Sequence, residues 1–385
     1  MPSREEVSYF GAGPAPLPTA VLQECASALV NFNNTGLSLA EISHRSPTAN
    51  KIIADTKDGL TKLLDIPTDT HEILFLQGGG SGEFSAVVLE RVRSEVESEL
   101  KVDYLVTGSW SLKASQEASR LIGSKYVNDE SVWAGQLTTP KRRAAFVYFC
   151  DNETVDGVEF PSFPAALEGN EGGVDEFNET VVVADMSSNF LSRPVDVKKY
   201  GVIFAGAQKN LGIPGITVAI VRKSLLALVP PPTFVHALAG SLPNITPPIV
   251  LDFATIAKNN SLYNTLPVFS LYVATLVLQS LVHRFAGSIA GQQQEAAAKA
   301  AAIYAALDAH PAVYHVLPDR AVRNADREAA FVKGAEARGL LGLKGHRSVG
   351  GIRVSNYNAV PVAAVDKLVA WINEFATSTS TPTSV

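Results

Sequence analysis

The sequence predicts an α/β fold: a large domain with a mainly parallel central sheet flanked by helices, and a smaller C-terminal α+β domain. Apolar runs alternate with helical patterns from about residue 18 to residue 222, and such alternation is typical of a parallel sheet covered on both faces. A proline-rich stretch at 230–248 separates this block from a more helical one. The chain of 385 residues is also long enough for two domains.

The large domain is predicted to open with two helices. Pro18 suits the first turn of one helix, and a second amphipathic run begins at Pro47. A further apolar run at 216–221 follows the last of the strands after only a short turn, so we expect an antiparallel strand there. The strands before it are predicted at 73–76, 104–106, 145–149, 181–184 and 202–205.

The C-terminal part is predicted to be mostly helical. Polar residues interrupt the apolar stretch at 266–282, so we interpret it as a buried or subunit-facing helix and not as a membrane span. An alanine-rich helix is expected at 295–310 and a strand at 353–355. We place the large domain at 18–265, the small domain at 1–17 with 266–376, and a disordered tail at 377–385.

Composition and cysteine content favour a globular protein of the cytoplasm. Apolar residues make up 46% of the chain and charged residues 18%, which excludes a disordered protein. The net charge of −6 gives no support for a nucleic-acid or membrane partner. Cys25 and Cys150 are too few for a disulfide framework, and the N-terminal residues do not resemble a signal peptide. We also expect no metal.

Polar or small residues follow each of the predicted parallel strands. Ligands bind at the carboxyl ends of the strands in open α/β sheets, so these endings are expected to converge on one crevice. In chain order they are Gly78-Gly-Gly-Ser81, Gly108-Ser-Trp110, the turn from Asp151 through Thr154, Asp185, and Lys209.

Lys209 and Asp185 together predict a pyridoxal phosphate enzyme. Lys209 stands where an apolar strand breaks into a small-residue turn, and partial desolvation there lowers the pKa of an amine and makes it nucleophilic. Asp185 ends another apolar strand and would hold the proton on the cofactor's ring nitrogen. The alternatives are an ordinary surface lysine and a turn-capping aspartate.

Three other strand ends suit parts of the same cofactor. The glycines at 78–80 and Ser81 precede a helix whose N-terminal N–H groups would receive a phosphate, although a capped glycine turn explains them equally well. Trp110 would stack on a flat ring, unless it is a core residue. Thr154 would bind the ring's phenolic oxygen, or only stabilise its own turn.

Two basic pairs stand apart from these strands. They are His44-Arg45 and His346-Arg347. Arginine binds carboxylate or phosphate through a bidentate fork, so two such sites suit a substrate with an anion at each end. Solvated loop charge is the alternative for either pair alone.

The chain resembles the phosphoserine aminotransferases, a class V aminotransferase group among the fold type I pyridoxal phosphate enzymes. The resemblance runs in order over nearly the whole chain and is most specific at Gly-Ala-Gln-Lys-Asn and Lys-Gly-His-Arg. The matching segments are 13–18, 43–45, 78–84, 152–157, 184–188, 192–196, 206–210, 264–265 and 344–351.

The resemblance implies a role for each matching residue. Lys209 would link covalently to the cofactor and shuttle the proton, and Asp185 would pair with the ring nitrogen. Trp110 and Thr154 would contact the ring. The residues that would hold the cofactor phosphate are Gly80, Ser81 and Gln208, joined by Asn264 and Thr265 from the neighbouring subunit of a homodimer. The substrate-binding residues would be Arg347 for a carboxylate and His44, Arg45 and His346 for the distal anion.

The activity implied is transfer of the amino group of L-glutamate to 3-phosphohydroxypyruvate in serine biosynthesis, giving O-phospho-L-serine and 2-oxoglutarate. Bacterial members often carry arginine where Ser81 stands, so one cation for the distal anion is missing here. A cysteine desulfurase is a weaker interpretation, because neither Cys25 nor Cys150 suits a mobile loop. A non-catalytic phosphate-binding protein would leave Lys209 and Asp185 without a role.

Overall fold

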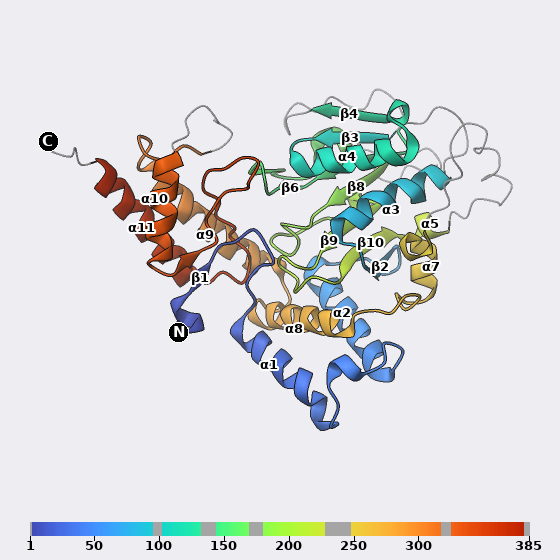
Figure 1. The fold of residues 1–385 in the computed structure, drawn as a ribbon. Coiled ribbons are helices and arrows are strands. Elements are labelled where there is room, and N and C mark those ends of the chain that lie inside the picture. The colour runs from blue at the N-terminus through green and yellow to red at the C-terminus, as the bar shows by residue number, and fades with distance from the viewer. Residues whose placement is uncertain are drawn as a thin grey trace.

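The computed structural model describes residues 2–94, 102–131, 144–168, 180–227, 248–316 and 325–380. Its centre is a seven-stranded sheet with the order β2-β10-β9-β8-β5-β3-β4 (Figure 1). Only β10 runs antiparallel to its neighbours. The strands are β2 (His71–Leu76), β3 (Val102–Val106), β4 (Val127–Ser131), β5 (Phe146–Cys150), β8 (Val181–Asp185), β9 (Val202–Gly206) and β10 (Thr217–Arg222).

Helices cover both faces of this sheet. Successive side chains of a strand point to opposite faces, and the buried residues accordingly form two cores, with Phe75 and Val147 in one and Leu74 and Phe146 in the other. On the first face lie α1 (Thr19–Val30), α2 (Pro47–Leu64) and α8 (Val268–Arg284). On the second face lie α3 (Gly79–Ser94), α4 (Ser109–Ile122) and α7 (Phe253–Lys258), and the short α5 (Lys223–Leu226) follows β10.

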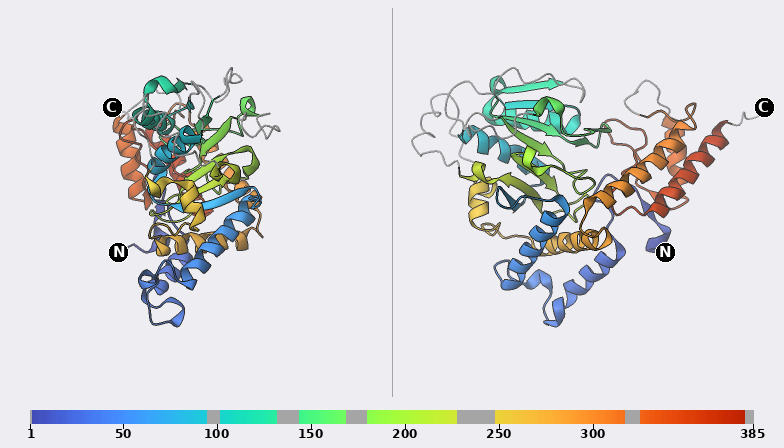
Figure 2. Two further views of the ribbon diagram at one scale, coloured as in Figure 1. Left: turned by 90° about the vertical axis from the view of Figure 1, so that its right-hand side faces the viewer. Right: turned by 180° about the vertical axis from the view of Figure 1, so that it is seen from behind.

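The C-terminal lobe has a third core of its own, and it lies beside the sheet (Figure 2). The helices of this lobe are α9 (Ile289–Asp308), α10 (Ala325–Glu336) and α11 (Val362–Ser380). Near the N-terminus, β1 (Ser8–Tyr9) pairs in parallel with β11 (Leu340–Leu341), so the first residues of the chain join this lobe. A separate hairpin beyond β5 consists of β6 (Asn152–Glu153) and β7 (Val158–Glu159).

Most of the predicted elements form, with three differences. The edge strand β4 was not predicted, because its sequence Val-Asn-Asp-Glu-Ser lacks an apolar run. Residues 353–355 form no strand, although the N–H groups of Arg353 and Ser355 donate to the carbonyls of Leu343 and Phe10. Residues 377–380, predicted as part of a disordered tail, are helical in α11, and 381–385 lie outside the described residues.

Helix α8 bears on the predicted domain boundary at residue 265. Its apolar residues belong to the core of the large sheet, and Thr275 on α8 shares a buried hydroxyl hydrogen bond of 2.7 Å with Thr56 on α2. This packing favours a boundary after Arg284, and the division into domains stays a prediction. None of the described helices is long and apolar enough to cross a membrane alone; α8 and α9 pass that test only as a pair bent by 89°.

Candidate active site

Lys209 lies in the turn between β9 and β10, where the sheet meets the C-terminal lobe. It is half-buried, and its Nζ donates a hydrogen bond to the carbonyl of Ala12 and lies 5.5 Å from the ring centroid of Tyr357. Burial, together with the positive charge of Arg353, lowers the pKa of the amine to about 8, while Asp185 acts in the opposite direction. A substantial fraction of this amine is therefore neutral and nucleophilic near physiological pH.

Asp185 ends β8, the strand beside β9. Its side chain is buried, and Oδ1 accepts a hydrogen bond of 2.8 Å from the backbone N–H of Ser187. Burial raises the pKa of the carboxyl to about 6, and the bonds to Ser187 oppose that rise. Because burial penalises the anion, a cation bound beside Asp185 would be strongly favoured.

Gly80 faces the carboxyl of Asp185. A Cβ on Gly80 would lie 3.8 Å from Asp185 Oδ2, so the first turn of α3 and the end of β8 are neighbours. The backbone of α3 begins at Gly79, and the first N–H groups of a helix have no partner within it. Ser81 is exposed in this turn. The arrangement places an anion-binding helix end beside an acid that favours a cation.

The turn after β5 fixes Trp110 in place. Trp110 Nε1 donates to Thr154 Oγ1 at 3.1 Å, which holds the two predicted ring contacts together. Glu153 accepts the backbone N–H groups of Trp110 and Ser111, both at 2.8 Å, and Asp156 accepts the N–H of residue 109 at 2.6 Å. Two carboxylates thus cap the first turn of α4. The sequence analysis missed this role, although both acids stand within the Asn-Glu-Thr-Val-Asp-Gly motif.

Gln208 precedes Lys209 and is half-buried. A Cβ on Gly206 would lie 2.6 Å from Gln208 Oε1, so the side chain of Gln208 folds back over the end of β9. Its backbone carbonyl accepts a hydrogen bond of 2.8 Å from Ala15. Gln208 and Lys209 therefore both contact the N-terminal segment, and the side-chain amide of Gln208 lies near the end of β9.

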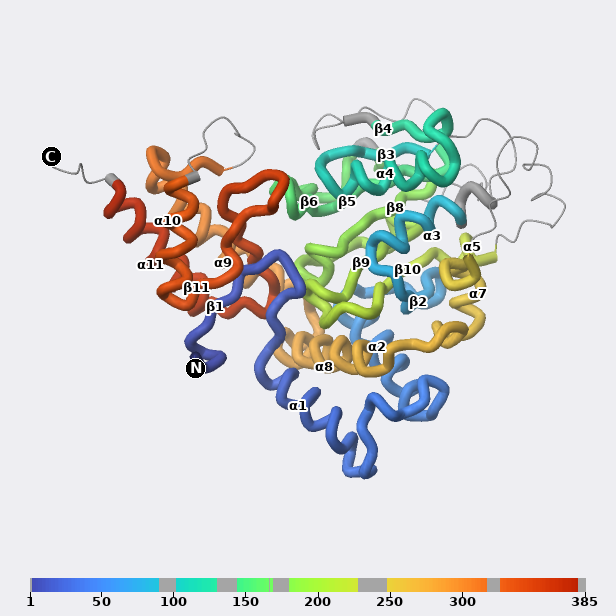
Figure 3. The backbone as a smooth tube through the Cα atoms, in the orientation of Figure 1, coloured from blue at the N-terminus to red at the C-terminus, as the bar shows by residue number. Residues whose placement is uncertain are grey.

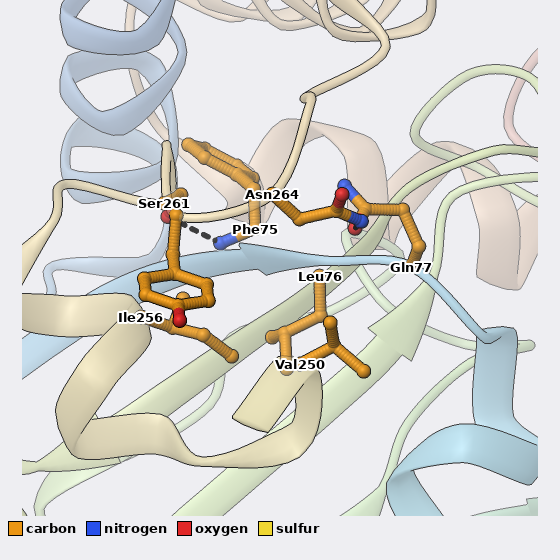
Figure 4. A pocket seen from close by; sticks show the side chains of 8 residues that line it. Phe75, Leu76, Gln77, Val250, Ile256, Ser261 and Asn264 are labelled. Carbon is orange, nitrogen blue, oxygen red and sulfur yellow. Dashed lines mark hydrogen bonds between the residues drawn. The ribbon is translucent and has the colours of Figure 1, made fainter. Parts of the chain in front are cut away.

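Asn264 and Thr265 lie at the surface, next to the glycine turn. Asn264 Nδ2 donates to Gln77 Oε1 at 2.8 Å, and Gln77 directly precedes that turn. Figure 4 shows these two side chains meeting at one end of a small pocket that the exposed Val250 and Tyr263 also line. Neither Lys209 nor Asp185 is among the residues that line this pocket.

The two basic pairs remain apart from Lys209 within this chain. His44 is half-buried, and its buried Nε2 has no hydrogen-bond partner in the part of the chain that the structure describes; Arg45 beside it is exposed. His346 is hydrogen-bonded through Nδ1 to Ser348 at 2.6 Å, and Arg347 is exposed. In the described part of the chain, neither pair bonds to Lys209 or Asp185.

Arg353 is a candidate that the sequence analysis missed. It is half-buried, its Nε is buried and has no hydrogen-bond partner among the described residues, and its charge acts on both Lys209 and Tyr357. An arginine that is part-buried beside the reactive amine and not paired through Nε suits an incoming carboxylate. The sequence signal that could have identified Arg353 is its position two residues after Gly351, the last residue of the segment 344–351 that resembles the phosphoserine aminotransferases. That stretch was interpreted only as a strand.

These residues fit pyridoxal phosphate. A desolvated amine, a buried acid and the Trp110–Thr154 pair meet the needs of its aldehyde, ring nitrogen and ring face, and the start of α3 suits its phosphate. A lysine and an aspartate at the ends of neighbouring parallel strands, on this α/β fold, define a class of pyridoxal phosphate-dependent transferases.

Comparisons with known proteins agree with this class. Residues 7–346 match the model of the Aminotransferase class-V family. The phosphoserine aminotransferase of Saccharomyces cerevisiae is 44% identical over 97% of this chain and 98% of its own length. That of Drosophila melanogaster is 42% identical over 94% and 96%.

Solved structures agree as well. The phosphoserine aminotransferase of Bacillus circulans subsp. alkalophilus superposes with a TM-score of 0.81 at 34% identity, over 96% of this chain and 98% of that one. The pyridoxal phosphate-bound enzyme of Trichomonas vaginalis superposes with a TM-score of 0.79 at 34% identity, over 95% and 99%. This chain therefore belongs to the class V aminotransferase family, among the phosphoserine aminotransferases. It is a transaminase that uses pyridoxal phosphate, with the fold type I architecture that the sequence predicted.

Proposed function

We propose that this chain transfers the amino group of L-glutamate to 3-phosphohydroxypyruvate, giving O-phospho-L-serine and 2-oxoglutarate for serine biosynthesis. The observation that carries the proposal is the pair formed by Lys209, with its lowered pKa, and the buried Asp185, in a chain of this family. The bound cofactor supplies the electron sink that makes the substrate Cα–H bond acidic.

Lys209 is the residue that holds the cofactor and moves the proton. Its pKa of about 8 suits both tasks, because the amine must be neutral to attack and basic enough to accept the Cα proton. Asp185 pairs with the ring nitrogen, Trp110 covers the ring, and Thr154 meets the ring oxygen. The cofactor phosphate is held by Gly80, Ser81 and Gln208.

Arg353 is the better candidate for the substrate's α-carboxylate. It acts electrostatically on Lys209 and has a buried, unpartnered Nε, whereas Arg347 is exposed. A fork of N–H donors beside the reactive amine would orient the Cα–H bond toward Lys209. His44, Arg45 and His346 remain candidates for the distal anion of either substrate, with Arg347 beside them.

The active sites are proposed to be shared within a homodimer. Asn264 and Thr265 are exposed beside the glycine turn, where a phosphate held by a second subunit would be within their reach. Asn264→Ala should therefore weaken cofactor retention. Sedimentation measures the assembly: a monomer that keeps full activity would contradict the shared site.

We also propose a cytoplasmic location and no nucleic-acid or membrane partner. Cys25 and Cys150 are both free and buried, as is typical of a reducing compartment. Fractionation of cells that express the tagged chain checks this; recovery in a membrane or organelle fraction would contradict it.

One experiment tests the reaction. The purified protein, loaded with pyridoxal phosphate, should lose its visible absorbance on addition of glutamate and regain it on addition of 3-phosphohydroxypyruvate. ³¹P NMR should then show phosphoserine in amounts equal to the 2-oxoglutarate released. If glutamate bleaches the absorbance but 3-phosphohydroxypyruvate does not restore it, the protein is still a transaminase, but 3-phosphohydroxypyruvate is not its amino acceptor.

A further inference from the structure

Residues 10–15, which we call the N-terminal strap, run between the C-terminal lobe and the sheet (Figure 3). The strap is bonded to both sides. Phe10 donates to the carbonyl of Leu341 at 2.9 Å and accepts from Ser355 at 3.0 Å, both in the C-terminal lobe. At its other end, Ala15 donates to the carbonyl of Gln208 at 2.8 Å, next to Lys209. The backbone of the strap is therefore held directly over the reactive lysine.

The carbonyl of Ala12, in the middle of the strap, receives two donors. One is Lys209 Nζ, and the other is the hydroxyl of Tyr357, at 2.8 Å. A carbonyl oxygen has two lone pairs, so these donors use its full capacity. The strap also passes very close to the amine: a Cβ on Gly13 would lie 2.6 Å from Lys209 Nζ.

Tyr357 is itself firmly fixed. Its side chain is buried, and Lys299 Nζ, also buried, donates to the carbonyls of Tyr357 at 3.0 Å and Val360 at 2.8 Å. The next residue, Asn358, bonds through its N–H to Asn210 Oδ1 at 2.9 Å, in the turn that carries Lys209. The hydroxyl of Tyr357 thus has a set position relative to that turn.

We propose that Tyr357 is a positioning residue that acts through the Ala12 carbonyl to hold the ε-amine of Lys209 whenever it is not bonded to the cofactor. The inference rests on the proposed role of Lys209. During transamination the incoming amino group displaces this amine, which must stay close to the substrate Cα to carry its proton. An acceptor fixed by Tyr357 keeps the amine there, and the aromatic ring beside it favours the charged form.

The direction in which the loss of the Tyr357 hydroxyl should change the pKa of Lys209 follows from the hydrogen-bonding groups and charges around the amine. A carbonyl that accepts from the amine stabilises its protonated form and raises its pKa, as Asp185 does, whereas Arg353 lowers it. Burial raises the pKa of Tyr357 itself to about 12, so its hydroxyl stays a donor up to pH 10. Without that hydroxyl the carbonyl of Ala12 loses one of the contacts that orient it toward Lys209, and the protonated amine loses part of its stabilisation.

The test is the pH dependence of acetylation of Lys209 in the full chain, measured by mass spectrometry between pH 6 and 10 after the cofactor is removed with hydroxylamine. Tyr357→Phe keeps the ring and removes only the hydroxyl. Its labelling midpoint should fall by about half a pH unit, because one hydrogen bond contributes on the order of that shift. Tyr314→Phe is the matched control, since it loses a hydroxyl bond of 2.7 Å to Ile372 within the C-terminal lobe, and its midpoint should equal that of the wild type.

The outcomes separate this inference from the proposed function. A midpoint that is unchanged or raised in Tyr357→Phe overturns the inference, whatever the activity of the enzyme. If Tyr357→Phe loses secondary structure, Tyr357→Met takes its place, because methionine has no hydrogen-bond donor and adapts to irregular space in a core, and it carries the same prediction. In cofactor-loaded protein, kcat should fall about three- to tenfold with the KM for glutamate unchanged. Labelling that follows the prediction in a protein without transaminase activity would support the strap and refute the function.

Discussion

Replacing Arg353 with methionine removes the guanidinium beside Lys209 but keeps a side chain of similar length. If Arg353 binds the substrate carboxylate through two charge-assisted hydrogen bonds of about 1.5–3 kcal/mol each, their loss should cost about 3–6 kcal/mol in the transition state. That corresponds to a fall in kcat/KM of about 10²–10⁴-fold for glutamate. Arg347→Met, at the exposed arginine that the sequence favoured, should cost less than tenfold for the same substrate.

The assay is steady-state transamination by both variants between pH 6 and 10. Burial and, to a smaller extent, the charge of Arg353 lower the pKa of Lys209 to about 8. Removing that charge should therefore raise the pKa and move the rising limb of the pH–activity profile to higher pH. A large loss in Arg347→Met with a small loss in Arg353→Met would refute the assignment and restore the one made from sequence. If the pH profile of Arg353→Met is the same as that of the wild type, the proposed effect of the Arg353 charge on the pKa of Lys209 is contradicted.

The other predictions concern the residues around the cofactor. Asp185→Asn should lower kcat by about 10²-fold, because an amide cannot pair with the charged ring nitrogen; turnover equal to the wild type would contradict that role. Glu153→Gln should lose about 2 kcal/mol of stability, because only one of its oxygens could still accept the N–H groups of α4, and an unchanged unfolding temperature would count against it. Gly13→Ala should lower the visible absorbance per subunit, since its Cβ would meet the Lys209 amine. Gly36→Ala, at a positive φ of 77° with open space around it, is the control and should keep full absorbance.

The parallel sheet could be predicted because its strands are buried on both faces. Each of β2, β5, β8 and β9 is a nearly continuous apolar run, which follows from its cover of helices. The edge strand β4 carries three polar residues between Val127 and Ser131, so periodicity could not find it. It forms because it pairs with β3. That pairing depends on the tertiary structure and cannot be inferred from the residues of β4 themselves.

The site residues that could be predicted from the sequence are reactive side chains that follow the ends of apolar strands. Lys209 and Asp185 both stand close after apolar runs. Burial lowers the pKa of the Lys209 amine, as the sequence led us to expect, and it also raises the pKa of Asp185, which the sequence did not predict. Arg353, Tyr357 and the Ala12 carbonyl could not be found in this way. They come from the other lobe and the N-terminus, and only tertiary packing brings them to the lysine.

The central claim is that Lys209 holds the cofactor. Borohydride reduction of the yellow protein, followed by peptide mapping, measures this directly, because the reduced link leaves the pyridoxyl phosphate mass on one lysine. The account predicts that Lys209 carries the pyridoxyl phosphate group, in an amount that matches the loss of visible absorbance, and that no other lysine does. Lys299 is a demanding internal control, since burial also lowers its pKa to about 8. A label on Lys299, or a colour that Lys209→Ala leaves intact, would contradict the account.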